Sequence, residues 1–522
     1  MDPRLMDKEV LCGYDIRQIQ SYIFAGDNEA TIAGASILVK NIIHEALRYG
    51  VEKFQPPLQP EQYQLNDWDS TGDIPYFHDP RILIQLIYVG GGNAFVLYRK
   101  GSICQQINRR ISRYFLDHSY SLTLAAGVVE KTDDIVADTS RLYDELDKIK
   151  FSMKPREPLC SLPIVETEQD TGYPVIGRDR ETGELISEES MLKSMRYRAS
   201  GRKESLMRVL SGSGMIAMVH ADGNNMGNAL KTVMQTATDY ESGIKIRRYV
   251  NKNINDSIVE SISQTEAWFL QKLRNRGIGE EEIKRSYYRF EIGGDDVNFI
   301  ILPQYALSFV EYFIKECAKR VMWYDEKIGE IKFSFCAGVA FVGRNVSYSN
   351  GIKIAEEACQ SAKFRGKKPE NLINGQVGNW IDFHMSENAT MENLDYVRSR
   401  VYKDTQNNSL LLRPYCLDPE SRKFPFSFER CKEYAAFFRG QKKMRTQIQK
   451  LQNAHSFGKP EVRDLLEELK LQGFEMPRKF GSPYVKVQDE QNQTCAKWFD
   501  AIEMYEVFED LMEEIGNGDH QN

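Results

Sequence analysis

The chain has 522 residues, of which 41% are hydrophobic and 27% are charged, and its formal net charge at pH 7 is −7. This is the composition of a globular protein with room for about two to four domains, and the negative charge argues against a surface built for broad nucleic-acid binding. No run of about 20 apolar residues occurs and the first residues lack a signal peptide, so we expect a soluble, cytoplasmic protein without membrane contact. Nine cysteines without a C-x-x-C pair favour reduced thiols over a disulfide framework.

The chain begins with strand-like segments separated by glycine-rich connections. An apolar run that starts at Cys12 ends at Asp15. We interpret the small residues in 26–34 as a loop before a helix that has Ser36 near its start. Residues 87–97 place three glycines between two apolar runs, which predicts a hairpin.

A further apolar strand is predicted over residues 122–129, and it completes a first domain over residues 1–146. Residues 147–212 differ from this domain because they are rich in charge, proline and turn glycine. We therefore predict a connector there.

A nearly unbroken apolar run over residues 215–221 is followed at once by Asp222. Such a run predicts a buried central strand with a carboxylate at its end, where ligands of such sheets bind. The small Gly223 would let a phosphate chain approach the backbone. Alternatively, Asp222 caps the helix that follows Asn224 and Asn225.

Two adjacent carboxylates, Asp295 and Asp296, follow Gly293 and Gly294 between two alternating apolar runs. The glycines supply the positive φ angles of a tight hairpin, which holds the acids at its tip. Neighbouring carboxylates repel each other unless a hard cation such as Mg²⁺ neutralises them. Beside Asp222 in one sheet, the pair would form a two-metal site. The alternative is a solvated turn, because Asp and Gly are common turn residues.

Residues 333–342 predict another buried strand, and a helix is expected over residues 351–364. Lys363 borders the apolar stripe of this helix, so it either reaches past the stripe into solvent or points at an anion in the site. The basic residues that follow, among them Lys367, favour a phosphate. This strand and helix complete a second domain over residues 213–385. Long amphipathic segments then predict an all-helical domain over residues 386–522.

The first domain repeats the order of elements found in the second, which indicates an internal duplication. Where the second copy has Asp295 and Asp296, the first copy has Gly92 and Asn93. One copy can therefore hold metals, and the other lacks the acids to do so.

These motifs resemble those of GGDEF-type nucleotide cyclases. They are more closely similar to the second palm of the large polymerase-like subunit of type III CRISPR effectors, where the motif is GGDD. The first copy resembles the first palm of that subunit, so the resemblance spans roughly residues 10–385. It implies an α+β fold with two ferredoxin-like palm domains, followed by the all-helical C-terminal domain.

Two features of that family are not expected here. His78-Asp79 does not fit the HD nuclease that often precedes the first palm, because the pair lies just before a strand, and we interpret it as a loop feature. Many members carry a cysteine-ligated zinc between the palms, and without a C-x-x-C pair we expect no zinc.

The resemblance implies metal-assisted nucleotidyl transfer with Mg²⁺ or Mn²⁺. It makes Asp222, Asp295 and Asp296 catalytic, and Gly223 a further metal ligand beside them. Ser36 is the candidate contact for the nucleotide whose hydroxyl attacks, held by the first palm. The other expected nucleotide-binding residues are Gly223, Asn224, Asn225, Gly293, Gly294, Lys363 and Lys367.

By the same resemblance, the product would be a cyclic oligonucleotide, such as a cyclic oligoadenylate made from ATP or another NTP in antiviral defence. CRISPR-type partner subunits or an activating RNA are the implied partners, and we expect the two palms to face each other within one chain. Alternatives are a mononucleotide or dinucleotide cyclase, or a catalytically silent scaffold that binds nucleotide or RNA.

Overall fold

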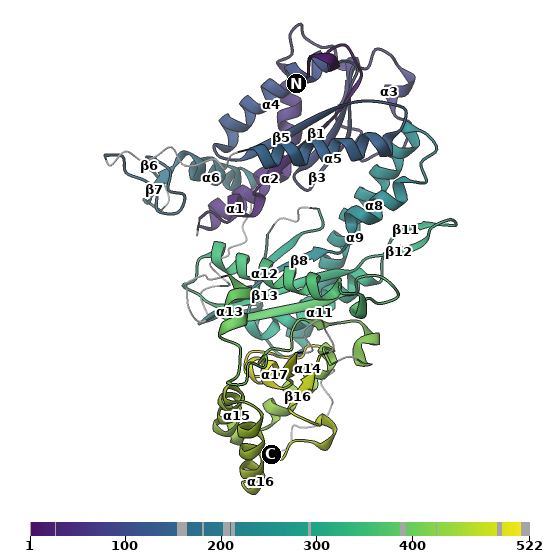
Figure 1. Ribbon diagram of the computed structural model, residues 1–522. Coiled ribbons are helices and arrows are strands. Elements are labelled where there is room, and N and C mark those ends of the chain that lie inside the picture. Colours follow the sequence, from purple (N-terminus) through teal and green to yellow (C-terminus); the bar gives the residue numbers. More distant parts are fainter. Residues whose placement is uncertain are drawn as a thin grey trace.

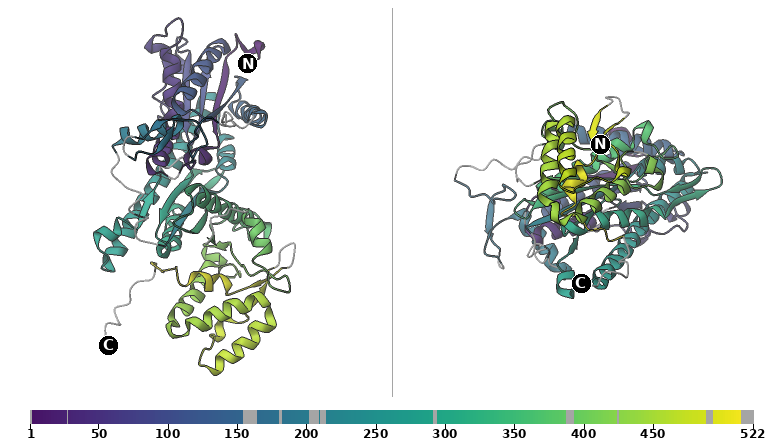
Figure 2. Two further views of the ribbon diagram at one scale, coloured as in Figure 1. Left: turned by 90° about the vertical axis from the view of Figure 1, so that its left-hand side faces the viewer. Right: turned by 90° about the horizontal axis from the view of Figure 1, so that it is seen from below.

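The computed structural model describes residues 2–26, 28–153, 164–179, 182–201, 209, 214–290, 294–386, 393–423, 425–487 and 493–512. Two sheet-containing bodies and a mainly helical one follow each other along the molecule (Figures 1 and 2). The predicted fold class, mixed α+β with palm-type sheets and a helical C-terminal region, is confirmed. Within these residues, no helix combines the length and apolar character needed to cross a membrane.

The first palm is built on a five-stranded sheet. Its elements are β1 (Val10–Arg17), α1 (Ile19–Ile23), α2 (Glu29–Glu52), β2 (Tyr63–Gln64), α3 (Pro75–His78), β3 (Ile84–Gly90), β4 (Asn93–Tyr98), α4 (Gly101–Ser119), β5 (Thr123–Glu130) and α5 (Ile135–Ser152). The strand order is β2-β3-β4-β1-β5, which contains the order of a ferredoxin-like βαββαβ unit. Cys12 and Tyr14 of β1 pack with α2 and α4, whereas Leu11 on the opposite face packs with α5.

The second palm repeats this arrangement. Its elements are β8 (Met215–Gly223), α8 (Met226–Met234), α9 (Tyr240–Asn275), α10 (Glu280–Ile283), β9 (Tyr287–Arg289), β10 (Val297–Ile301), α11 (Pro303–Ala318), β11 (Val321–Asp325), β12 (Gly329–Lys332), β13 (Phe335–Gly343), α12 (Tyr348–Gly366), β14 (Trp380–Ser386) and β15 (Tyr415–Cys416). The strand order is β15-β14-β13-β8-β10-β9, so β9, β10, β8 and β13 take the places of β3, β4, β1 and β5. The shared order supports the duplication inferred from the sequence.

The two palms pack against each other, and α9 runs between them (Figure 1). Arg248 of α9 donates to the carbonyl oxygens of Leu86 and Ile87 in β3 at 2.8 and 2.9 Å. Phe24 of the first palm meets Phe290 of the second edge to face, with ring centroids 5.2 Å apart. Apolar residues of both palms belong to one buried cluster, so the palms form a single packed unit.

The connector folds onto the first palm through β6 (Val175–Arg178), β7 (Leu185–Ser187) and α6 (Glu188–Ser200). Helix α6 approaches α2 so closely that a Cβ atom on Gly34 would lie 1.8 Å from the carbonyl oxygen of Lys193. Because α2 already begins at Glu29, the interpretation of residues 26–34 as a loop is wrong. The small residues in this stretch allow α2 and α6 to pack closely, although their composition resembles that of a loop.

The C-terminal region is mainly helical, with α13 (Leu394–Arg400), α14 (Phe428–Gly440), α15 (Arg445–Phe457), α16 (Lys459–Leu471) and α17 (Phe499–Met504). It is not entirely helical, since β15 joins the second palm's sheet and β16 (Tyr484–Lys486) pairs with β17 (Thr494–Ala496). The fully buried ion pair between Arg413 and Asp500, 3.3 Å apart, ties α17 to the segment before β15.

Helix α12 depends on a glycine of β13. A Cβ atom on Gly338 would lie 1.9 Å from the carbonyl oxygen of Ala355 in α12. We expect Gly338→Ala to lower the free energy of unfolding by about 1–3 kcal/mol, as overpacking does, with a lower unfolding temperature in a thermal melt. Gly343→Ala on the same strand, where nothing lies within 4 Å, is the control and should change stability by less than about 0.5 kcal/mol. Equal effects of the two changes would contradict this role of Gly338.

Candidate functional site

Strand register brings the predicted acidic residues together at one end of the second sheet. Val297 of β10 pairs with Ala221 of β8, so the next residues outward, Asp296 and Asp222, stand opposite each other on one face of the sheet. Asp295 lies beside them, because a Cβ atom on Gly223 would be 3.3 Å from the Cβ atom of Asp295. The hairpin and the central strand thus deliver three carboxylates to one place.

The carboxylates are partly buried and repel one another. Burial, followed by repulsion from Asp222, raises the pKa of Asp295 to about 6. Burial and repulsion from both other acids raise the pKa of Asp296 to about 8. Glu356 of α12 adds negative charge near Asp296, and its own pKa is raised to about 7 by burial and by Glu357. The site is therefore short of positive charge.

Lys363 supplies the positive charge that the structure places among these acids. Its Nζ atom forms an ion pair with Asp222 and lies 3.2 Å from the carbonyl oxygen of Gly223. Its side chain is 12% exposed, so the ammonium does not reach past the apolar stripe into solvent. Burial opposes the charge, but Asp222 outweighs it, and the pKa of Lys363 is raised.

His220 is a neighbour that sequence reasoning missed. Its Nδ1 atom lies 2.9 Å from the Oδ1 atom of Asn298, its cross-strand partner. Burial lowers the pKa of His220, which favours the neutral imidazole that can bind a metal. His220, Asp222 and Asp296 each offer a ligand atom within 4.8 Å of the others. Two carboxylates and an imidazole suit a divalent cation. The sequence feature that could have identified His220 is its two-residue spacing from Asp222, because this spacing puts both side chains on one face of a strand.

The residues predicted to line the nucleotide have mixed environments. Gly223 is closely covered, since a Cβ atom there would lie 2.3 Å from the Cε atom of Met226. Asn224 is 6% exposed and donates to the carbonyl oxygen of Gly378, whereas its Oδ1 atom is buried without a partner. Asn225 has a φ of 55° and precedes α8. Gly294 has a φ of +73°, as a tight hairpin requires, and Gly293 lies outside the described residues.

Three other basic or polar residues lie away from the acids. Lys367 is exposed at the C-terminal end of α12. Arg365 donates to the carbonyl oxygens of Leu412 and Pro414, so it holds the C-terminal region and not a phosphate. Ser36 lies in the second turn of α2 in the first palm and is 5% exposed.

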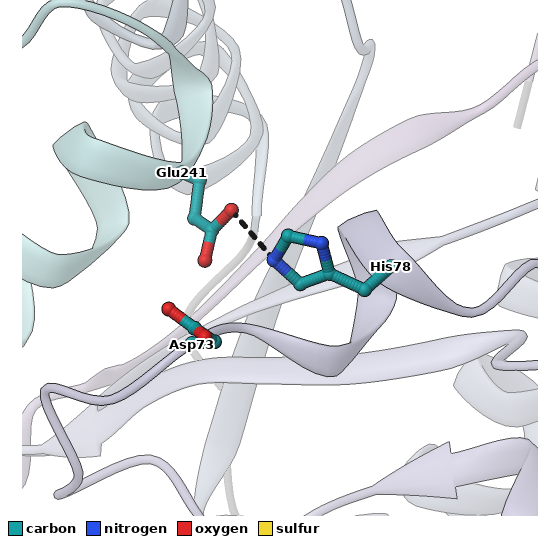
Figure 3. Close-up of side chains that lie close together, drawn as sticks. All are labelled: Asp73, His78 and Glu241. Carbon is teal, nitrogen blue, oxygen red and sulfur yellow. Dashed lines mark ion pairs between the residues drawn. The ribbon is translucent and has the colours of Figure 1, made fainter.

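A second group of possible metal ligands lies between α3 and α9. Asp73, His78 and Glu241 point toward one another in Figure 3, and the Nε2 atom of His78 lies 3.1 Å from Glu241. Lys245 already pairs with Asp73 at 2.8 Å and with Glu241 at 3.1 Å. His78 ends the single-turn helix α3, and Asp79 accepts hydrogen bonds from Arg81. These contacts join the first palm to α9, and no ligand is needed to balance them.

Residues 215–371 match the family model of Cas10/Cmr2, second palm domain. This match confirms the resemblance that Asp222, the GGDD hairpin and the Lys363 helix indicate. A comparison with the curated proteins found no significant match.

Solved structures of a Csm1-Csm4 cassette contain chains similar to this one. The apo form has a TM-score of 0.53 at 10% identity over 97% of this chain and 71% of that chain. The complex with pppApApA gives 0.54 at 11% identity over 97% and 70%, and the complex with cA3 gives 0.50 at 10% identity over 97% and 70%. At these identities the likeness shows a shared fold, and it extends over nearly the whole chain.

The acid cluster predicts how stability depends on pH. Both carboxyl pKa values are raised above the ordinary 3.8, so the stability that the protonated groups contribute is complete below about pH 4. It is lost as the pH rises through about 6 and about 8. The unfolding temperature of the metal-free protein should therefore fall between about pH 4 and pH 8. Millimolar Mg²⁺ or Mn²⁺ should raise it again at the higher pH.

Thermal melts in chelator and in each metal measure both effects. Asp295→Asn with Asp296→Asn removes the ionising pair and should flatten the pH dependence and weaken the metal response. If the unfolding temperature of this variant still fell with pH as in the wild type, titratable groups other than Asp295 and Asp296 would be responsible.

Proposed function

We propose that this chain, whose residues 215–371 match the second palm domain of Cas10/Cmr2, is a nucleotidyltransferase of the cyclase type that joins nucleoside triphosphates and releases pyrophosphate. The observation that carries the proposal is the convergence of Asp222, Asp295 and Asp296 on Lys363 at the end of β8 and β10. Divalent cations neutralise such a set of carboxylates and can bridge it to the oxygens of a triphosphate, whose charge the ammonium of Lys363 would offset in part.

Asp222, Asp295 and Asp296, with the carbonyl oxygen of Gly223, would hold two Mg²⁺ or Mn²⁺ ions. Bound there, such ions lower the pKa of a ribose hydroxyl and stabilise the charge on the α-phosphate and the departing pyrophosphate. The ion pair of Lys363 with Asp222 would open, because metal binding neutralises the carboxylate. The ammonium is then available for the β- and γ-phosphates.

Other residues of the second palm would orient the same nucleotide. Asn224 keeps a buried Oδ1 atom without a protein partner. Asn225, at the start of α8, and Gly294 would present backbone groups to it, and Gly293 stays a predicted nucleotide contact. Lys367, exposed beyond Lys363 on α12, would add positive charge at the outer end of the triphosphate.

The first palm would hold the nucleotide whose hydroxyl attacks. Its hairpin meets the GGDD hairpin, since a Cβ atom on Gly294 would lie 3.4 Å from the Cα atom of Gly91. Two nucleotides held on either side of this contact would be close and oriented, which is what transfer between them needs. Ser36 remains the candidate contact in this palm. Because it is 5% exposed, a nucleotide reaches it only after a local rearrangement.

ATP is the proposed substrate and a cyclic oligoadenylate the proposed product, in CRISPR-type antiviral defence. The fold is shared with Csm1-Csm4 cassettes solved with pppApApA and with cA3, which favours adenine nucleotides and a Csm4-like partner subunit. An activating RNA would be the further partner. Purified chain incubated with each NTP and Mg²⁺ or Mn²⁺, with products identified by mass spectrometry, tests substrate and product together.

The acid pair is the first target for mutation. Asp295→Ala with Asp296→Ala should abolish product formation and metal binding and leave the fold intact, because it relieves the repulsion within the pair. Glu467→Ala with Glu468→Ala removes an adjacent exposed acid pair from α16 and is the matched control, with activity unchanged. Turnover at the wild-type rate in the Asp295/Asp296 variant would remove the metal-site assignment.

Lys363 is the second target. Lys363→Ala should weaken triphosphate binding by about 1.5–3 kcal/mol, the range for hydrogen bonds to charged groups, and should affect diphosphates less. Lys353→Ala, exposed on the same helix, serves as control and should bind as the wild type does. Nucleotide titration measures both variants. Unchanged triphosphate affinity after Lys363→Ala would mean that Lys363 pairs with Asp222 and does not bind phosphate.

A further inference from the structure

A buried histidine beside the carboxylates of the second palm has a ring nitrogen to which the proposed function gives no role. We infer that the Nε2 atom of His220 binds one metal ion of this site, that Asn298 positions the imidazole, and that the site thereby prefers Mn²⁺ over Mg²⁺. This inference rests on the proposed function in one respect, namely that metal ions occupy the acid cluster. It adds a nitrogen ligand and a metal preference that the sequence motifs did not indicate.

Strand register places the imidazole on the face of the sheet that holds the acids. His220 and Asp222 are two residues apart on β8, so their side chains share one face. His220 pairs with Asn298 on β10 and with Gly338 on β13, and paired residues also share a face. A Cβ atom on Gly338 would point at α12, so the imidazole lies between the sheet and the helix that carries Lys363.

A hydrogen bond from the imidazole decides which ring nitrogen is available. The Nδ1 atom of His220 lies 2.9 Å from the Oδ1 atom of Asn298. An amide oxygen only accepts, so Nδ1 carries the proton and the neutral ring keeps its lone pair on Nε2. His220 is 5% exposed, and among the residues that the structure describes its Nε2 atom has no hydrogen-bond partner. A buried acceptor nitrogen is therefore free to bind a cation.

The ligand set around this nitrogen is mixed. His220, Asp222 and Asp296 each offer a ligand atom within 4.8 Å of the others, and Asp295 beside them would remain for the second ion. Mg²⁺ prefers oxygen ligands and gives up its water reluctantly. Imidazole nitrogen instead favours ions of the first transition series. Replacing one oxygen ligand by His220 should therefore shift the preference of the site toward Mn²⁺.

Asn298 acts through His220 as a positioning residue. It is 7% exposed and lies two residues from Asp296, so its amide shares the face of the acids. Hydrogen-bond partners of this kind fix the orientation of metal-bound histidines, and their loss weakens metal binding roughly 10- to 100-fold. If the site binds metal through the acids alone, the bond between Asn298 and His220 only satisfies a buried histidine. Spectroscopy of the bound metal separates these two roles.

The probe is Mn²⁺ alone, added to the full chain without nucleotide. Electron spin-echo envelope modulation detects nitrogen bound directly to Mn²⁺, and the wild type should show it. Protein labelled with ¹⁵N-histidine should show ¹⁵N in place of ¹⁴N, which identifies a histidine without any substitution. His220→Asn removes the Nε2 atom but keeps a donor toward Asn298, and it should lose the signal. His78→Asn removes the imidazole of the other possible metal group and is the matched control, with the signal retained.

Metal titrations measure the preference. The signal of free Mn²⁺ gives its affinity, and competition gives that of Mg²⁺. His220→Asn should lower the preference for Mn²⁺ over Mg²⁺ roughly 10-fold or more, and Asn298→Ala should weaken Mn²⁺ binding roughly 10-fold. Asn298→Asp keeps an acceptor oxygen and should bind Mn²⁺ as the wild type does.

No nitrogen signal in the wild type, or an unaltered signal in His220→Asn, would overturn the inference. Equal losses of Mn²⁺ and Mg²⁺ affinity in His220→Asn would overturn the metal preference. A chain that makes a cyclic product with Mg²⁺ but shows no nitrogen signal would contradict this inference alone. A nitrogen signal that depends on His220, in a chain that makes no product from any NTP, would support the inference while contradicting the proposed function.

Discussion

Repulsion among Asp222, Asp295 and Asp296 is the constraint around which the second palm is arranged. The register of β8 and β10 fixes the first and last of these acids opposite each other, and partial burial prevents water from screening them fully. One ammonium, that of Lys363, offsets three carboxylates. Its position depends on α12, which can approach β13 only because Gly338 has no side chain. The fold thus maintains a concentration of negative charge that divalent cations would neutralise.

The first palm shows the same scaffold with a different charge. Its strand order matches that of the second palm, and Asp15 with Lys150 occupies the place of Asp222 with Lys363. The hairpin that would carry the acid pair carries Gly92 and Asn93. A duplicated unit has thereby diverged into one half whose cluster has three carboxylates around Lys363 and one half whose cluster lacks the acid pair. Two residues of one hairpin therefore decide whether the site of a palm has the acid pair.

Much of the second palm could be predicted from local sequence, because its strands are continuous apolar runs and Gly294 marks the hairpin. Asp222 and Lys363 were predicted for the same reason, since each adjoins an apolar element whose direction is fixed by its neighbours. The small residues before Ser36 misled the prediction, because their role is contact with α6, a distant segment. Lys150 had no local signal at all, because it lies in a charged helix and only the tertiary fold brings it to Asp15.

The packing between the palms bears on the kind of transfer that the chain can support. One hydrophobic cluster runs through both palms, and Arg248 binds two carbonyl oxygens of β3, so the halves hold a fixed relation. The hairpins of the two palms meet at Gly91 and Gly294, whose φ angles of +58° and +73° favour glycine. A reaction inside one nucleotide would gain nothing from this proximity, whereas a reaction between two nucleotides gains the full benefit of orientation. The geometry of the pair of palms therefore favours joining of separate nucleotides over cyclisation of a single one.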